Sequence, residues 1–198
     1  MAYEPWISLN LFCWRKPLMF VFGHAGLTLM GYQILWRKKA GSPPIGVPQL
    51  TAILFFSLLP DLLDKPLTLW FFQEAASTRW VGHTMAFSLM VCAAVYFFIP
   101  SLKKWVWACP GHLLLDGMWR SPHTLFFPLL GWEMDPGSDP RISFWEFLAS
   151  SIHRVVSEPE LVLPELLGLL VLLLALFRLK AFLPGRARVA QSLPRLQP

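Results

Sequence analysis

Residues 161–177 read LVLPELLGLLVLLLALF, a run of 17 residues that is dominated by leucine. A helix that crosses the hydrocarbon core of a bilayer needs about 20 apolar residues, within a range of about 17 to 25. This run therefore predicts a membrane-spanning helix over Leu161–Phe177. The whole composition agrees, because 55% of the 198 residues are hydrophobic and only 15% are charged, whereas soluble domains carry about 25% charged residues.

Four further apolar segments precede this run. They are Leu18–Trp36, Pro48–Leu63, Trp80–Pro100 and Lys104–Trp119. The second and the fourth are short for a crossing, and the fourth, which contains Pro110, can dip into the bilayer instead of spanning it. The sequence therefore predicts an all-α polytopic membrane bundle of about five membrane-embedded helices.

The longest segment outside the predicted spans is Arg120–Glu160. Within it, Ile142–Val156 has the spacing of an amphipathic helix that lies on the membrane surface, although packing over the bundle is an equally good interpretation. We expect residues 1–177 to form one membrane-embedded domain. The tail 178–198 is basic and contains proline, so we expect it to be disordered.

The charge distribution predicts the orientation of the chain. If five spans alternate, ten of the 17 Lys and Arg residues share the side that holds loop 37–47 and the tail, and 17 − 10 = 7 lie on the other side with all 12 acidic residues. Positive charge favours the cytoplasm. We therefore expect a multi-pass protein of the bacterial inner membrane with a cytoplasmic C-terminus. Topology accounts for the net charge of +5, so we expect membrane lipid, and no nucleic acid, as a partner. The oligomeric state leaves no trace in the sequence.

Ionisable residues in these segments gather toward one face, which is the periplasmic face in the predicted orientation. They are His24, Asp61, Asp64, Arg79, His83, His112, Asp116 and, just beyond the fourth segment, His123. Ionisable groups inside a bilayer are costly and usually face a bundle interior or a cavity. Their convergence from four segments therefore needs an explanation.

A metal site is the explanation that we favour. His112 and Asp116 are four residues apart in GHLLLD, so they share one helix face and could bind one cation together. Histidines and aspartates from the other segments would complete a site that suits zinc, or manganese where carboxylates dominate. Each motif alone has an ordinary reading, such as a capping role for His83.

Five motifs also carry a family resemblance. They are GHAGLTL (23–29), LLPDLLDKP (58–66), RWVGHT (79–84), GHLLLDGMW (111–119) and SPHTLFFP (121–128). This series resembles the YdjM-like family, described as inner-membrane-associated, LexA-binding, metal-dependent hydrolases, which is distantly similar to zinc-dependent phospholipase C. The family usually shows PDxD where this chain has PDLLD.

The resemblance implies a set of metal ligands and a reaction class. The implied ligands are His24, Asp61, His83, His112 and Asp116, with Asp116 as a bridge between two metals and His123 following as a further candidate. The implied activity is hydrolysis of a phosphoester, and a site near the membrane surface would suit a lipid-linked substrate. Metal would polarise the phosphoryl oxygen and activate water.

Two residues are predicted to be catalytic in this scheme. Asp64 would orient the water or act as a base, and Arg79 would stabilise the phosphate charge or anchor a lipid headgroup. Two alternatives stay open. The first is a non-catalytic membrane adaptor whose metal is structural. The second is an ion or proton transporter. The halves of the segments away from the ionisable residues are apolar, which disfavours a transporter because a conduction route needs polar groups along its whole length.

Overall fold

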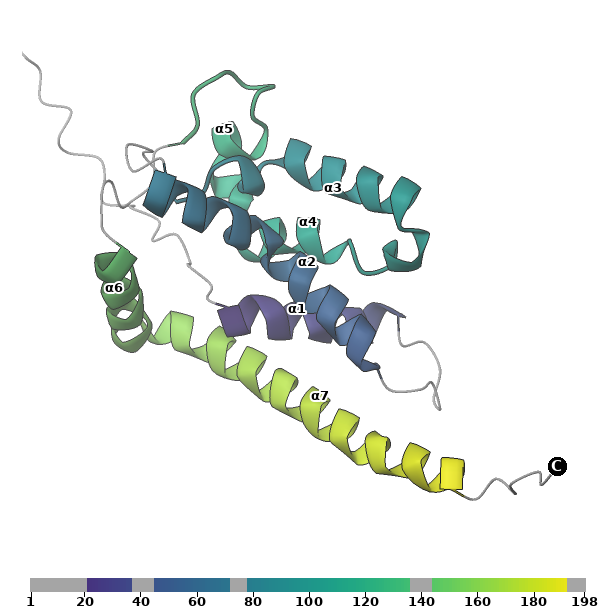
Figure 1. The fold of residues 1–198 in the computed structure, drawn as a ribbon. Coiled ribbons are helices and arrows are strands. Elements are labelled where there is room, and N and C mark those ends of the chain that lie inside the picture. The colour runs from purple at the N-terminus through teal and green to yellow at the C-terminus, as the bar shows by residue number, and fades with distance from the viewer. Residues whose placement is uncertain (1–20, 37–44, 72–77, 136–143, 192–198) are drawn as a thin grey trace, which may run out of the picture.

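The computed structural model of the chain describes residues 21–36, 45–71, 78–135 and 144–191, and within these ranges the protein is helical and contains no strand (Figure 1). The α-helices are α1 (Val21–Trp36), α2 (Val47–Pro66), α3 (Met85–Phe98), α4 (Ala108–Leu115), α5 (Pro122–Leu125), α6 (Phe144–Ser157) and α7 (Pro159–Gln191). Shorter turns are η2 (Leu67–Phe71), which continues α2, and η3 (Val81–His83), η4 (Pro100–Leu102) and η5 (Met118–Arg120). The predicted all-α class is confirmed.

Within the described ranges, two helices are long and apolar enough to cross a membrane. They are Val47–Phe71, with 25 residues, and Val162–Lys180, with 19 residues. The helices α1, α3 and α4 have 16, 14 and 8 residues, which gives lengths of about 24, 21 and 12 Å against a hydrocarbon core of about 30 Å. The predicted count of about five membrane-embedded helices is therefore wrong.

Local capping explains why the predicted third and fourth spans are too short. The hydroxyl of Thr84 accepts the backbone N–H of Phe87 at 3.0 Å and so begins α3 only there. Gly117 has a φ of 62° in the left-handed region, which ends α4 directly after Asp116. Apolar composition thus continues across turns that interrupt the helices.

The two long helices extend beyond their predicted ends. α2 continues past Leu63 into η2, so Asp61 lies ten residues, about 15 Å, before Phe71. α7 continues to Gln191, within the tail that the sequence analysis expects to be disordered, and residues 192–198 lie outside the described residues. The division into a domain and a cytoplasmic tail stays a prediction.

The predicted amphipathic helix is present as α6. Its side chains Trp145, Ile152 and Val156 are 73%, 57% and 78% exposed. α6 also contacts α7, so both interpretations, a helix on the membrane surface and a helix packed on the bundle, stay predictions.

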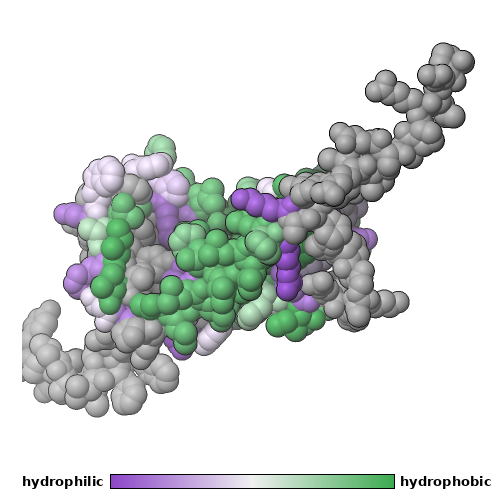
Figure 2. Space-filling view, turned by 90° about the horizontal axis from the view of Figure 1, so that it is seen from below, coloured by the Kyte–Doolittle hydropathy of each residue, from purple (hydrophilic) through white to green (hydrophobic). Residues whose placement is uncertain are grey.

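α1 is held between α2 and α7 (Figure 1). At the crossing with α7, a Cβ atom on Gly168 would clash with the backbone of Phe22 and Gly23, and one on Gly26 would clash with the backbone of Gly168. Small residues allow such close approach between membrane helices. The outer side of α7 is uncovered, since only 6% of the stretch Val162–Lys180 is buried. From the side on which α7 lies in Figure 1, the surface is mainly hydrophobic across its middle (Figure 2).

Candidate metal centre

Helices α1, α2 and α4 and the turn η3 bring seven of the eight predicted residues into one cluster. They are His24 on α1, Asp61 and Asp64 on α2, Arg79 and His83 at η3, and His112 and Asp116 at α4. The side chains of His24, His83 and His112 are completely buried. Residues that the sequence separates by up to 92 positions thus share one polar interior.

Four ligand atoms in this cluster have the spacing of a metal site. The Nε2 atom of His83 lies 3.3 Å from Nε2 of His112, 3.4 Å from Oδ2 of Asp116 and 3.6 Å from Oδ1 of Asp61. Tetrahedral zinc with bonds of about 2.0–2.1 Å separates its ligand atoms by about 3.3–3.4 Å. The three separations from His83 are close to this value, and Nε2 of His112 lies 4.0 Å from Oδ1 of Asp61.

His112 belongs to two overlapping groups of candidate ligands. One group is His83, His112 and Asp116, and the other is His24, Asp61 and His112, with the ligand atoms of each group within 4.8 Å of one another. The ring of His24 stacks on that of His112 at 4.1 Å, and its Nε2 lies 3.0 Å from Oδ1 of Asp116. The Nδ1 atom of His24 is buried and has no hydrogen-bond partner within the described ranges.

The orientation of two histidines is fixed from outside the cluster. Nδ1 of His83 lies 2.7 Å from Oδ2 of Asp64, and Nδ1 of His112 lies 2.7 Å from the carbonyl oxygen of Ser57. Because both partners only accept hydrogen bonds, both Nδ1 atoms carry the proton and both Nε2 atoms turn inward. Metal-binding histidines have this arrangement, in which the second ring nitrogen donates to a carboxylate or a carbonyl.

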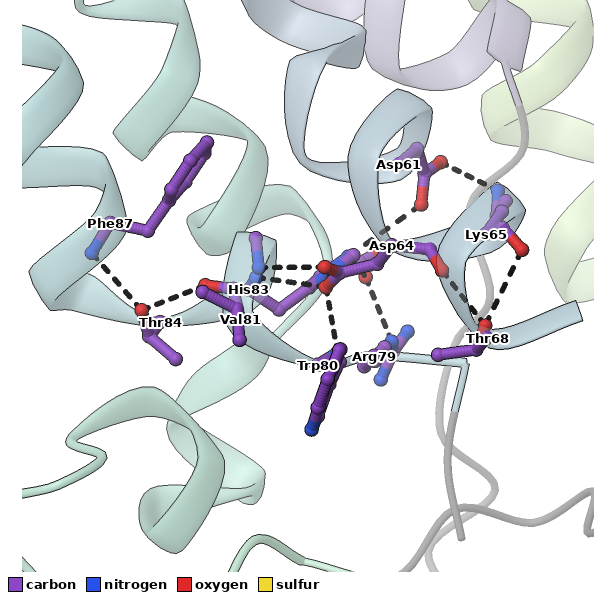
Figure 3. Close-up of polar contacts among 12 residues, drawn as sticks. Asp61, Asp64, Lys65, Thr68, Arg79, Trp80, Val81, His83, Thr84 and Phe87 are labelled. Carbon is purple, nitrogen blue, oxygen red and sulfur yellow. Dashed lines mark hydrogen bonds and ion pairs between the residues drawn. The ribbon is translucent and has the colours of Figure 1, made fainter. Parts of the chain in front are cut away.

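Asp64 also holds the turn that carries His83 (Figure 3). Its carboxylate accepts the backbone N–H groups of Trp80 at 2.6 Å, Gly82 at 2.7 Å and His83 at 3.1 Å. A Cβ on Gly82 would lie 2.8 Å from the carbonyl oxygen of Pro60 and 2.9 Å from Oδ1 of Asp64, so the turn requires glycine there. The catalytic role of Asp64 stays a prediction, but both its oxygens are already engaged in these contacts.

In the metal-free protein the two facing histidines differ in protonation. Burial opposes a charge on His83, but hydrogen bonds with Asp116 and Asp64 outweigh it and raise the pKa of His83 to about 9. Burial and the neighbouring His24 lower the pKa of His112 to about 3. Near neutral pH these opposite shifts favour the charged form of His83 and the neutral form of His112.

The more accessible side of the cluster carries two cations. Asp61, Arg79 and Lys65 have side chains that are 12%, 13% and 27% exposed. Nε of Arg79 lies 2.9 Å from Oδ2 of Asp116, and Nζ of Lys65 lies 2.6 Å from Oδ2 of Asp61. Sequence reasoning missed Lys65, although its position four residues after Asp61 places both on one helix face.

His123 is the predicted ligand that the structure leaves outside the cluster. It is exposed on the short helix α5 and belongs to neither group of candidate ligands in the described ranges. After Asp116 the left-handed Gly117 and the turn η5 redirect the chain. Closeness to the HxxxD motif in sequence therefore does not become closeness in space.

Fold and site together define an all-helical protein with two helices able to cross a membrane and a buried centre of histidine and aspartate. The profile of the family described as YdjM inner membrane protein matches residues 19–183, so the chain belongs to that family. This match confirms the family resemblance and the inner-membrane association. No curated protein and no solved structure matches the chain.

Proposed function

We propose that this protein is a membrane-bound metal-dependent hydrolase of phosphoesters. The observation that carries the proposal is the set of separations from Nε2 of His83 to His112, Asp116 and Asp61, which are 3.3, 3.4 and 3.6 Å. Two imidazoles and two carboxylates form a donor set that suits zinc, with manganese as the alternative. His24, whose Nδ1 is buried without a hydrogen bond in the described ranges, is the fifth candidate ligand.

A divalent metal held there would supply Lewis acidity toward a phosphoryl oxygen and lower the pKa of a water molecule. The residues of the chain contribute binding and orientation. Arg79 and Lys65 stand at the more accessible side of the cluster, where their charges can neutralise a phosphate group. Asp64 acts as a positioning residue for His83, since its oxygens already bind three backbone N–H groups and the imidazole.

A second candidate function is a non-catalytic membrane adaptor with a structural metal. The complete burial of His24, His83 and His112 favours it, because structural zinc sites are closed by protein ligands. Arg79 and Lys65 favour the hydrolase, because a purely structural centre has no need of partly exposed cations beside its carboxylates. Turnover therefore decides between the two functions.

The test uses the full chain purified in detergent. Bound metal is measured by elemental analysis for the wild type and for His112→Ala, with His153→Ala as the matched control, since His153 is exposed on α6. The wild type and the control are then given p-nitrophenyl phosphate and bis(p-nitrophenyl) phosphate with added zinc or manganese.

We expect stoichiometric metal in the wild type and in His153→Ala, loss of metal in His112→Ala, and metal-dependent turnover of a phosphoester. A wild type that binds no stoichiometric metal overturns the proposal. Bound metal that depends on His112, but without turnover of either ester, favours the adaptor with a structural metal.

A further inference from the structure

A cavity of about 420 Å³ is lined mainly by residues of α1 and of the segment 104–115, which contains α4. Thr28 follows His24 by four residues on α1, and Ala108 precedes His112 by four residues on α4, so each lies on the same helix face as its histidine. The rings of these two histidines stack at 4.1 Å. On α1 the lining runs from Leu27 to Leu35, away from His24, whereas on α4 it passes alongside His112, and none of the candidate ligands lines the cavity itself.

The lining of this cavity is almost entirely apolar. Polar side chains in it come from Thr28, Tyr32 and Lys104, and the other lining residues are hydrophobic or glycine. Sites for polar ligands usually combine an apolar wall with several converging polar groups, within about 300–1,000 Å³. This cavity has the volume of such a site but lacks the converging groups, and the family is an inner-membrane family. A hydrocarbon chain is the occupant that this chemistry fits.

We infer that this cavity binds an acyl chain of a lipid phosphoester whose phosphate is hydrolysed at the metal centre. The inference rests on the proposed function and names the substrate class. Thr28 is four residues from His24 on α1, and the lining residues Gly111 and Leu115 are next to His112 and Asp116 in the sequence, so the cavity lies beside the helix segments that carry these candidate ligands. Thr28, whose Oγ1 is buried with no hydrogen-bond partner in the described ranges, offers a hydroxyl to the ester group between phosphate and chain.

Two glycines make the inference testable without damage to the fold. A Cβ added at Gly31 or at Gly111 would meet nothing within 4 Å, and both glycines line the cavity. Gly31→Leu and Gly111→Leu therefore add apolar volume at the cavity wall, and the Cβ of each new side chain has open space. Ala94→Leu is the control, because Ala94 is exposed on α3 and adds a similar side chain away from the cavity.

The first measurement is independent of activity. The full chain in mixed micelles is photo-cross-linked to dipalmitoyl-type phosphatidic acid with a diazirine in its acyl chain, and the adducts are mapped by mass spectrometry. We expect adducts on residues 27–35 and 104–115 in the wild type and in Ala94→Leu, and their loss in both glycine variants. The inference is overturned if the wild type has no adducts on these residues, or if the adducts persist in both glycine variants.

The second measurement compares substrates with and without chains. The pairs are dipalmitoyl phosphatidic acid with glycerol 3-phosphate, and dipalmitoyl phosphatidylglycerol with glycerophosphoglycerol. Displacing two or three methylenes from the cavity should lower kcat/KM for the lipid by about tenfold or more, with unchanged turnover of the chainless ester and unchanged metal content. Equal turnover of the lipid by all variants overturns the inference and leaves the hydrolase standing. If the cross-links are lost in the glycine variants but no phosphoester is turned over, the result contradicts the proposed hydrolase function instead.

Discussion

The imidazole of His83 donates from Nδ1 to the carboxylate of Asp64 over 2.7 Å, and both side chains are completely buried. The same carboxylate holds the backbone of the turn that carries His83. Asp64 therefore controls both the position and the tautomer of a histidine whose Nε2 faces three other candidate ligand atoms. Groups in this role often matter to a metal site nearly as much as the ligands do.

Replacing Asp64 with asparagine should weaken zinc binding by about 10- to 100-fold. The amide keeps the size of the side chain but turns one acceptor into a donor that faces backbone N–H groups, so the turn moves and His83 loses its orientation. Zinc affinity is measured by competition with a fluorescent chelator. Asp135→Asn is the control, because Asp135 also accepts a backbone N–H, that of Thr124, but stands outside the cluster. Equal affinity of both variants would contradict the positioning role.

Gly82→Ala should also reduce zinc affinity by about tenfold or more, although it touches no ligand. The added Cβ would press on the carbonyl of Pro60 and on Asp64 and push His83 outward. Gly111→Ala serves as the matched control, since its Cβ meets nothing within 4 Å. Unchanged zinc content in Gly82→Ala would show that the turn adapts without moving His83.

The close crossing of α1 and α7 should affect zinc binding, because α1 carries the candidate ligand His24. Gly168→Ala places a methyl group against the backbone of Phe22 and Gly23, so α1 must move and carry His24 away from Asp116. We expect destabilisation of about 1–3 kcal/mol, seen as a lower Tm in detergent, together with weaker zinc binding. Gly31→Ala, on the same α1 but in open space, should leave both properties as in the wild type. A Gly168→Ala protein with wild-type Tm would argue against this crossing.

Zinc affinity should fall as the pH falls. In the metal-free protein the pKa of His83 is about 9, so below pH 9 zinc must displace one proton from this ring. His112, whose pKa is lowered to about 3, adds no further proton near neutral pH. The affinity should therefore drop by about tenfold for each pH unit between pH 8 and 6. A flat profile over this range would exclude His83 as a ligand.

The sequence predicted a periplasmic metal centre and a cytoplasmic C-terminus on the condition that five spans alternate, and because only two helices in the described ranges are long enough to cross, this orientation needs a direct test. A reporter enzyme that is active only in the periplasm, fused after Pro198, should be silent, and one that is active only in the cytoplasm should be active. The opposite pattern would invert the orientation and place the centre toward the cytoplasm. The fused protein must retain the metal content of the unfused chain for this result to count.

The sequence predicted the helical class and the family, and it identified ionisable residues that lie close together in the structure. His24, Asp61, His83, His112 and Asp116 come together as the motifs indicated. These residues are recognisable because buried ionisable groups are rare and costly in apolar segments. Helix lengths were predicted poorly, since hydropathy does not register a cap at Thr84 or a left-handed glycine at position 117.

By itself, the sequence determined that this protein belongs in a membrane and that its few ionisable side chains need partners, because apolar composition and the cost of buried charge are properties of the residues. Only the tertiary structure decided which helices are long enough to cross and how the partners are shared. It assigned Asp64 to the turn of His83, placed Arg79 beside Asp116 and left His123 outside. The physical reason is that hydrogen bonds between distant segments have direction and length, which a one-dimensional spacing of residues does not specify.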